Sequence, residues 1–188
     1  MVYNPTENRL GIQPIAVALA PTSLYQTGQS TSFYAGQHRL GEIIRAVDPT
    51  FGGGEFIYLS GVASTVVGSL VSYDPVNATT TLSSITETGV GSTGGGNRPL
   101  AVAMSACVSG YYGWYQIAGA AVIKKGAVSV SPSVPLYLSG VTAGRVTSVL
   151  SSTKEIMNAR SVNAATVASA TSTITAIIQR PFSQGQIT

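Results

Sequence analysis

Turn-forming residues interrupt this chain at short, regular intervals, and this spacing limits the length of every secondary-structure element. Glycine, Asn-Pro and Asp-Pro signals recur about every eight to twelve residues, a spacing typical of β-sandwiches and β-barrels. Short runs rich in β-branched and aromatic residues lie between them, for example residues 56–60, 66–73 and 79–82. More than half of the residues are Gly, Ser, Thr, Ala or Val, which disfavours long surface helices. The sequence therefore predicts an all-β fold: a compact barrel or sandwich of short antiparallel strands.

The first 37 residues differ from the rest of the chain. They combine four aromatic residues with proline interruptions and a polar stretch over residues 26–32, and no helical periodicity runs through them. We predict an extended N-terminal arm over residues 1–37 that contacts neighbouring subunits, followed by a β-barrel or sandwich core over residues 38–188. Residues 87–97 are expected to form a flexible glycine-rich loop, because they carry little side-chain mass.

Three local patterns predict particular elements of the core. Residues 111–118 and 120–124 are expected to form a hairpin that turns at Gly119. Alternating Thr and apolar residues predict a strand near the end of residues 164–178, which stops before Arg180-Pro181 and seals a sheet edge. Residues 152–158 are the only stretch whose pattern is compatible with a helix.

Charged residues are scarce in this chain. It has ten Lys or Arg, seven Asp or Glu and a formal net charge of +3. The arginines are scattered and only Lys124 and Lys125 are adjacent, so the basic clustering of nucleic-acid-binding proteins is missing and we expect no nucleic-acid partner. Charge helps to keep small domains soluble and apart. We therefore expect partner proteins to cover much of this surface.

No hydrophobic stretch approaches the roughly 18 consecutive apolar residues that a transmembrane helix requires. Residues 12–20 are apolar and follow Arg9, as in a signal peptide, but the run is short and Pro14 interrupts it. We expect an extended or strand-like segment here and no membrane partner.

The residues that a nucleophilic or metal site requires are few. His38 and Cys107 are the single histidine and the single cysteine, so they would have to pair for thiol catalysis. The apolar neighbours of Cys107 indicate a buried core thiol instead. One histidine and one cysteine do not make a Cys/His zinc site. We predict no metal, no cofactor and no catalytic residues.

The carboxylates have simple structural interpretations. Asp48 and Asp74 each precede a proline, where an Asp side chain commonly initiates a turn. Glu42 and Glu55 are the remaining candidates for a hydrolase carboxylate pair, and the simpler interpretation is ion pairing with nearby arginines. We favour the simpler interpretation and predict that the chain is not an enzyme.

Aromatic residues are the candidates for partner contacts. Residues 111–115 hold four rings in five positions, and Tyr and Trp are enriched at protein interfaces. Core packing on alternate faces and a sugar-stacking platform around Trp114 are the alternatives for this cluster. Our predicted interface residues come from the arm and from this cluster: Tyr3, Tyr25, Phe33, Tyr34, Tyr112 and Trp114.

Four segments together resemble a known family. They are HRLGEIIRAVDPTFGGGEFIYLSGV at residues 38–62, RPLAVAMSA at 98–106, YGWYQIAG at 112–119 and AGRV at 143–146. In order and spacing the chain resembles capsid decoration, or cement, proteins of tailed bacteriophages, over roughly residues 38–182. Two features depart from that pattern: Arg39 stands where a proline is more usual, and the N-terminal arm is long.

The resemblance implies a structural rather than a catalytic role. It implies an all-β protein on the outer surface of an icosahedral head, which bridges neighbouring major capsid protein subunits against internal DNA pressure. We expect a homo-oligomer, a trimer or a dimer, made in the bacterial host cytoplasm and incorporated into the virion. The alternative function is a carbohydrate-binding or host-adhesion module on the virion surface.

Overall fold

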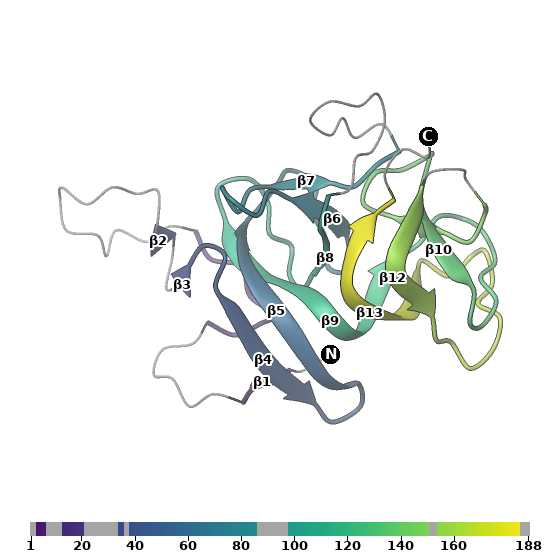
Figure 1. Cartoon of the computed structure of the whole chain (residues 1–188), viewed down its shortest axis with the longest axis horizontal. Helices are drawn as coiled ribbons and strands as arrows, with labels where there is room; N and C mark the ends of the chain where they lie inside the picture. Colours follow the sequence, from purple (N-terminus) through teal and green to yellow (C-terminus); the bar gives the residue numbers. More distant parts are fainter. Residues whose placement is uncertain are drawn as a thin grey trace.

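The computed structural model describes residues 3–6, 13–20, 34–35, 38–85, 98–150 and 154–184, and strands form all of their regular secondary structure (Figure 1). In chain order the strands are β1 (Asn4–Pro5), β2 (Tyr34–Ala35), β3 (His38–Arg39), β4 (Ile43–Asp48), β5 (Gly52–Ser60), β6 (Leu70–Tyr73), β7 (Thr80–Leu82), β8 (Leu100–Ala103), β9 (Tyr112–Lys124), β10 (Pro135–Leu138), β11 (Val146–Thr147), β12 (Glu155–Ser161) and β13 (Thr173–Ser183). The all-β prediction is confirmed.

Eleven strands form one antiparallel sheet with a branch. Its main path runs β1-β4-β5-β9-β13-β12-β10-β11, while β8 also pairs with β9 and carries β6 and β7 with it. Figure 1 shows β4 and β5 on one side of β9 and β13, β12 and β10 on the other. The path does not return to its first strand, so the sheet is open and sandwich-like, not a closed barrel. Strands β2 and β3 pair separately.

Strand β9 is continuous over 13 residues, so the hairpin predicted around Gly119 is wrong. Its first half pairs with β5 and β8, and its second half pairs with β13. The register against β5 shifts between Glu55 and Phe56, which is a β-bulge. Gly119 follows this bulge with φ of +102°, and a Cβ there would lie 2.4 Å from the Gly53 carbonyl oxygen. The glycine therefore permits a close approach of two strands and does not make a turn.

Strand β12 begins at Glu155 and covers residues 155–158 of this stretch, so the helical interpretation of residues 152–158 is wrong. Ile156 and Ala159 are both buried although they are three residues apart, because the register against β13 shifts between Met157 and Ala159. Asn158 adopts φ of 61° at this shift, which is a bulge rather than a helical turn.

The predicted strand near the C-terminus exists, but it extends further than expected. β13 continues through Arg180 and Pro181 to Ser183, and the same register shift lies opposite these two residues. Arg180 has a φ of 45°, and proline is tolerated in strands at bulges of this kind. β13 lies between β9 and β12, so it fills the middle of the sheet and does not seal an edge.

The core consists of three apolar clusters. The largest consists of residues from β10–β13, from the second half of β9, and from β6 and β8 of the branch. The other two lie on opposite faces of β5 and β9: alternate residues Ile57 and Leu59 belong to one, and Phe56 and Tyr58 belong to the other. Both strands are therefore buried on two faces over much of their length.

The described parts of the expected N-terminal arm pack against this core. β1 pairs with β4, and Tyr3 and Ile15 are buried in the cluster that contains Phe56 and Tyr58. Leu19 bridges to Tyr112 through two backbone hydrogen bonds of 2.9 Å. Residues 3–6 and 13–20 therefore cover one face of β5 and β9. The glycine-rich residues 87–97 lie outside the described residues.

We expect Gly119→Ala to lower the free energy of unfolding by about 2 kcal/mol or more, because it adds both backbone strain and a clash with Gly53. Gly110→Ala is the matched control: Gly110 has a φ of +82° and nothing within 4 Å of a built Cβ, so only the strain of about 1 kcal/mol remains. Urea unfolding measures both values. Equal losses for the two variants would contradict the close approach at Gly119.

Candidate functional site

Two of the predicted aromatic contact residues that the structure describes are buried inside the chain. Trp114 is fully buried and Tyr3 is 6% exposed, so both are core residues of this chain and are not available to a partner. Tyr112 is half-buried, and Tyr34 lies in β2. Tyr25 and Phe33 lie outside the described residues. Core packing, the alternative for the 111–115 cluster, therefore accounts for Trp114.

Gln13 connects the N-terminal segment to the aromatic core. Its side chain is fully buried, and its Oε1 accepts a 2.8 Å hydrogen bond from the Tyr58 hydroxyl. Its amide nitrogen donates to the Val17 carbonyl and to the Tyr112 carbonyl. Its own carbonyl accepts a 3.1 Å bond from the indole N–H of Trp114. One residue thus provides hydrogen-bond partners for the buried polar groups of both Tyr58 and Trp114.

His38 belongs to the same cluster and has both ring nitrogens engaged. Nε2 accepts a 3.0 Å bond from the Gln13 backbone N–H, so Nδ1 carries the proton and donates to Glu42 over 3.3 Å. The ring lies 4.9 Å from Trp114 and 5.3 Å from Tyr58, measured between centroids. This arrangement holds the histidine as a structural bridge, with no free nitrogen to act as a general base.

The structure does not bring His38 and Cys107 together as a catalytic pair. Cys107 packs in the cluster on the other face of β5 and β9, where burial raises the pKa of its thiol. A raised pKa disfavours the reactive thiolate. The prediction of a buried core thiol at Cys107 is confirmed.

The carboxylates take the structural roles predicted for them. The Asp48 carboxylate accepts hydrogen bonds from the backbone N–H groups of Thr50 and Phe51. Asp74 does the same for the N–H groups of Val76 and Asn77. Both are turn-forming Asp side chains.

Glu42 and Glu55 are engaged by different partners and do not form a pair. Glu42 contacts His38, whereas Glu55 lies between two arginines, 3.1 Å from the Arg45 guanidinium and 3.1 Å from that of Arg180. The hydrogen bond from Arg180 is the largest cause that holds the pKa of Glu55 below its usual value. Sequence reasoning expected an arginine partner for these glutamates, but the contact with Arg180 depends on the bulge in β13.

Within the described ranges, no group of three or more His, Cys, Asp or Glu residues is arranged to hold a metal ion. The same residues include no helix with the length and apolar character needed to cross a bilayer.

The candidate interface is a cleft between the end of β9 and the loops around β10 and β11. Two hollows of about 470 and 500 Å³ adjoin there and share Thr142 and Arg145 in their walls. We call the two together the loop cleft. Its first hollow is apolar: it includes Val128, Leu138 and the exposed residues Val149 and Leu150.

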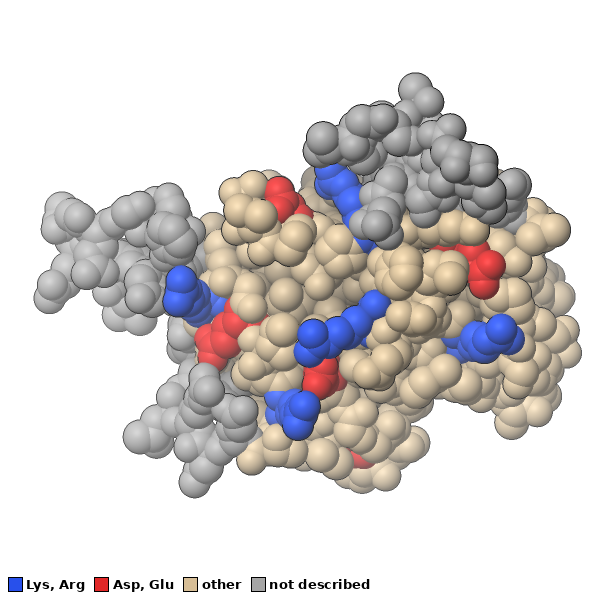
Figure 2. All heavy atoms as spheres, viewed as in Figure 1, with Lys and Arg blue, Asp and Glu red and all other residues tan. Residues whose placement is uncertain are grey.

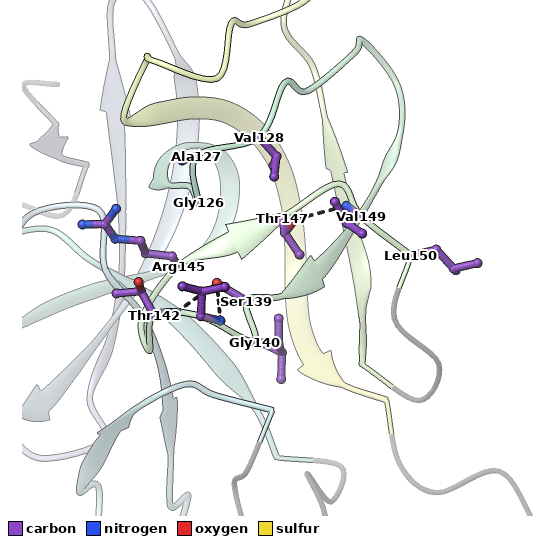
Figure 3. A pocket seen from close by; sticks show the side chains of 12 residues that line it. Gly126, Ala127, Val128, Ser139, Gly140, Thr142, Arg145, Thr147, Val149 and Leu150 are labelled. Atoms are coloured by element: carbon purple, nitrogen blue, oxygen red, sulfur yellow. Dashed lines mark hydrogen bonds between the residues drawn. The ribbon is translucent and has the colours of Figure 1, made fainter.

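The second hollow of the loop cleft has a mixed lining, in which Val66 and Leu82 stand beside basic and hydroxyl-bearing residues. Lys124 and Arg145 line it, together with hydroxyl-bearing residues Ser64, Ser69 and Thr142. Figure 3 shows the first hollow from close by, with Arg145 and Thr142 at one end and Val149 and Leu150 at the other. We call the second hollow the basic half of the cleft, because both Lys124 and Arg145 line it, and the first hollow the apolar half, because Arg145 is the only charged residue in its lining.

Sequence reasoning noted the adjacent Lys124 and Lys125 but not their separate roles. Strand alternation sends Lys125 inward, where it is 1% exposed and its ammonium donates to the carbonyls of Gly126, Val128 and Ser169. Burial lowers the pKa of Lys125. Lys124 points to the loop cleft instead. Successive side chains of a strand point to opposite faces, and this alternation was the sequence signal that could have separated the two lysines.

Comparisons of the chain with protein-family models, with curated proteins and with solved structures gave no match.

We expect Gln13→Met and Tyr58→Phe each to lower the free energy of unfolding by about 1 to 3 kcal/mol, because each removes buried hydrogen bonds. The double variant should lose less than the sum, since both changes remove the same bond. Urea unfolding followed by the fluorescence of Trp114, the single tryptophan, measures this. Gln179→Met, at an exposed position of β13, is the matched control with little effect. Strict additivity would show that the Gln13–Tyr58 bond contributes nothing.

Glu55 should make folding stability depend on pH. Its pKa is lowered in the folded state, so its contribution is present above the unfolded pKa of about 4.3 and is lost as the pH falls through the folded value. Because both arginines are largely exposed, we expect wild type to exceed Glu55→Gln by less than about 1 kcal/mol at pH 7. The difference should shrink between about pH 5 and pH 3.

Thermal unfolding of both proteins across this pH range tests the expectation. Glu155→Gln is the control, since Glu155 has no ion pair within the part of the chain that the structure describes. A stability difference for Glu55→Gln that stays constant down to pH 3 would contradict an ionic contribution.

Proposed function

We propose that this chain is a structural virion protein that decorates the outer surface of a tailed-bacteriophage head. In this role it stabilises the head by bridging adjacent major capsid protein subunits. The resemblance of residues 38–182 to capsid decoration proteins supports the proposal from sequence. The open antiparallel sheet is compatible with the all-β fold that this resemblance implies.

The exterior of the molecule is the observation that carries the proposal. Charged side chains form small separate groups among uncharged atoms on the face in Figure 2. Thirteen large apolar side chains are exposed among the described residues: Val17, Ile43, Val47, Val66, Val67, Val76, Val108, Tyr111, Val141, Val149, Leu150, Val162 and Ile177. The small number of charges on this exterior, rather than the scattered apolar side chains alone, favours coverage by another protein.

Covering this surface on a shell has a clear energetic basis. A valine or leucine that becomes fully buried stabilises a complex by up to about 1.5 to 3 kcal/mol, before the entropic cost of association. Few charges have to lose their hydration in the process, so the desolvation cost stays low. On an icosahedral lattice the same contact is repeated by symmetry, and weak contacts that engage together add up.

The proposed assembly is the one expected from the resemblance. The partner is the major capsid protein, and the chain acts as a homo-oligomer, a trimer or a dimer, on the head surface. It is made in the bacterial cytoplasm and acts in the virion. The burial of Trp114 removes the side chain that favoured the alternative, a sugar-binding module, because a stacking platform has to be exposed.

Binding to heads tests the proposed function. Heads of the encoding phage, assembled without this chain and emptied of DNA, are mixed with purified protein and sedimented. We expect saturable binding at a copy number fixed by the lattice, and a higher temperature of head disruption. Heads that already carry the chain are the control and should take up none. Absence of saturable binding would overturn the proposal.

A further inference from the structure

We propose that the loop cleft binds an extended segment of the partner protein that carries acidic residues next to aliphatic ones. The carboxylates of this segment would contact Lys124 and Arg145, and its aliphatic side chains would fill the hollow beside Val149 and Leu150. This inference rests on the proposed function, since it assigns the surface and the chemistry by which the chain contacts the capsid protein.

The basic half of the cleft has charges without partners. Within the described residues, the side chains of Lys124 and Arg145 have neither an ion pair nor a hydrogen bond, and no acidic residue lines either hollow. In contrast, Arg45 and Arg180 each form an ion pair with Glu55. Two unpaired cations that line one hollow favour a ligand with negative charge.

The apolar half of the cleft determines the kind of anion. Val141, Val149 and Leu150 are 96%, 57% and 77% exposed, and they border a hollow whose floor includes the buried Leu138. An inorganic anion held by the basic half would leave these side chains in water. A segment with both carboxylates and aliphatic side chains covers the two halves together.

The lining also favours a protein segment over other polyanions. No aromatic side chain lines either hollow, so bases and sugars have no surface on which to stack. Two cations are few for a nucleic-acid backbone, whose recognition depends on many phosphate contacts. Each hollow, at about 470 and 500 Å³, has the size of a small-ligand site, and the two together suit several residues of an extended chain.

The backbone around the cleft is fixed before any ligand binds. The Gly68 carbonyl accepts a 2.8 Å hydrogen bond from the Lys124 N–H, and the Gly144 carbonyl accepts a 2.9 Å bond from the Leu70 N–H. Both glycines have positive φ, and a Cβ at Gly144 would lie 2.9 Å from Leu82. Because the loops are attached to the core in this way, little ordering cost remains for binding.

Charge reversal at the cleft tests the inference on the full chain. The double variant Lys124→Glu/Arg145→Glu is compared with Arg39→Glu/Arg160→Glu, which changes net charge equally at residues outside both hollows. We expect the cleft variant to bind heads about tenfold or more weakly, and the control to change affinity by less than about threefold. Circular dichroism and thermal melting check that both variants remain folded.

A peptide probe tests the cleft without heads. The probe is a short synthetic peptide with two aspartates followed by valines and leucines, titrated into the isotope-labelled full chain and followed by NMR. We expect shifts at Lys124 and Arg145 and also at Val149 and Leu150. The same peptide with asparagines in place of the aspartates should bind about tenfold more weakly. Inorganic phosphate and duplex DNA are the comparison ligands.

The outcomes separate the inference from the proposed function. If wild type binds heads and the cleft variant binds them equally well, the inference is overturned and the proposed function stands. If wild type does not bind heads, the proposed function fails, and the peptide titration alone decides what the cleft binds. Equal shifts by phosphate or DNA at both halves of the cleft would overturn the preference for an acidic and apolar protein segment.

Discussion

Strand β9 has to be covered on both faces, and the rest of the structure depends on this constraint. Its 13 residues pair with β5, β8 and β13, and they place Trp114 on one face and Tyr115 on the other. The β6–β8 branch covers the second face. The first face is covered by the N-terminal residues around Gln13 and Ile15, whose hydrogen bonds satisfy the polar atoms of the aromatic rings.

The sequence predicted the class of fold because that class depends on local spacing. Turn signals and β-branched runs located β7 within residues 79–82 and β5 around residues 56–60. Bulges were the main source of error. The sequence predicts a turn at Gly119 and the end of a strand before Pro181, and both predictions miss a bulge. A bulge is defined by the register against the neighbouring strand, which neither residue reveals. That information lies in the partner strand, far away in the sequence.

The candidate site was harder to predict than the fold. Composition indicated a charge-poor exterior, but aromatic residues were expected to make the contacts, and Trp114 and Tyr3 are needed in the core instead. The loop cleft is built from residues 64–69, 124–128 and 138–150 with Leu82, and the AGRV segment at 143–146, which drew attention for its resemblance, does not by itself indicate a cleft. Its character comes from Lys124 and Arg145 meeting across loops, and such a meeting depends on the register of β9, β10 and β11.

The position of the N-terminal residues has a consequence for how the molecule matures. The Trp114 indole bonds to the carbonyl of Gln13, 101 residues earlier, and the Tyr3 hydroxyl bonds to the carbonyl of Ala120, 117 residues later. Tyr3 and Gln13 therefore cannot make these two bonds until residues 114–120 have been synthesised. Folding that depends on such distant contacts is intrinsically slow.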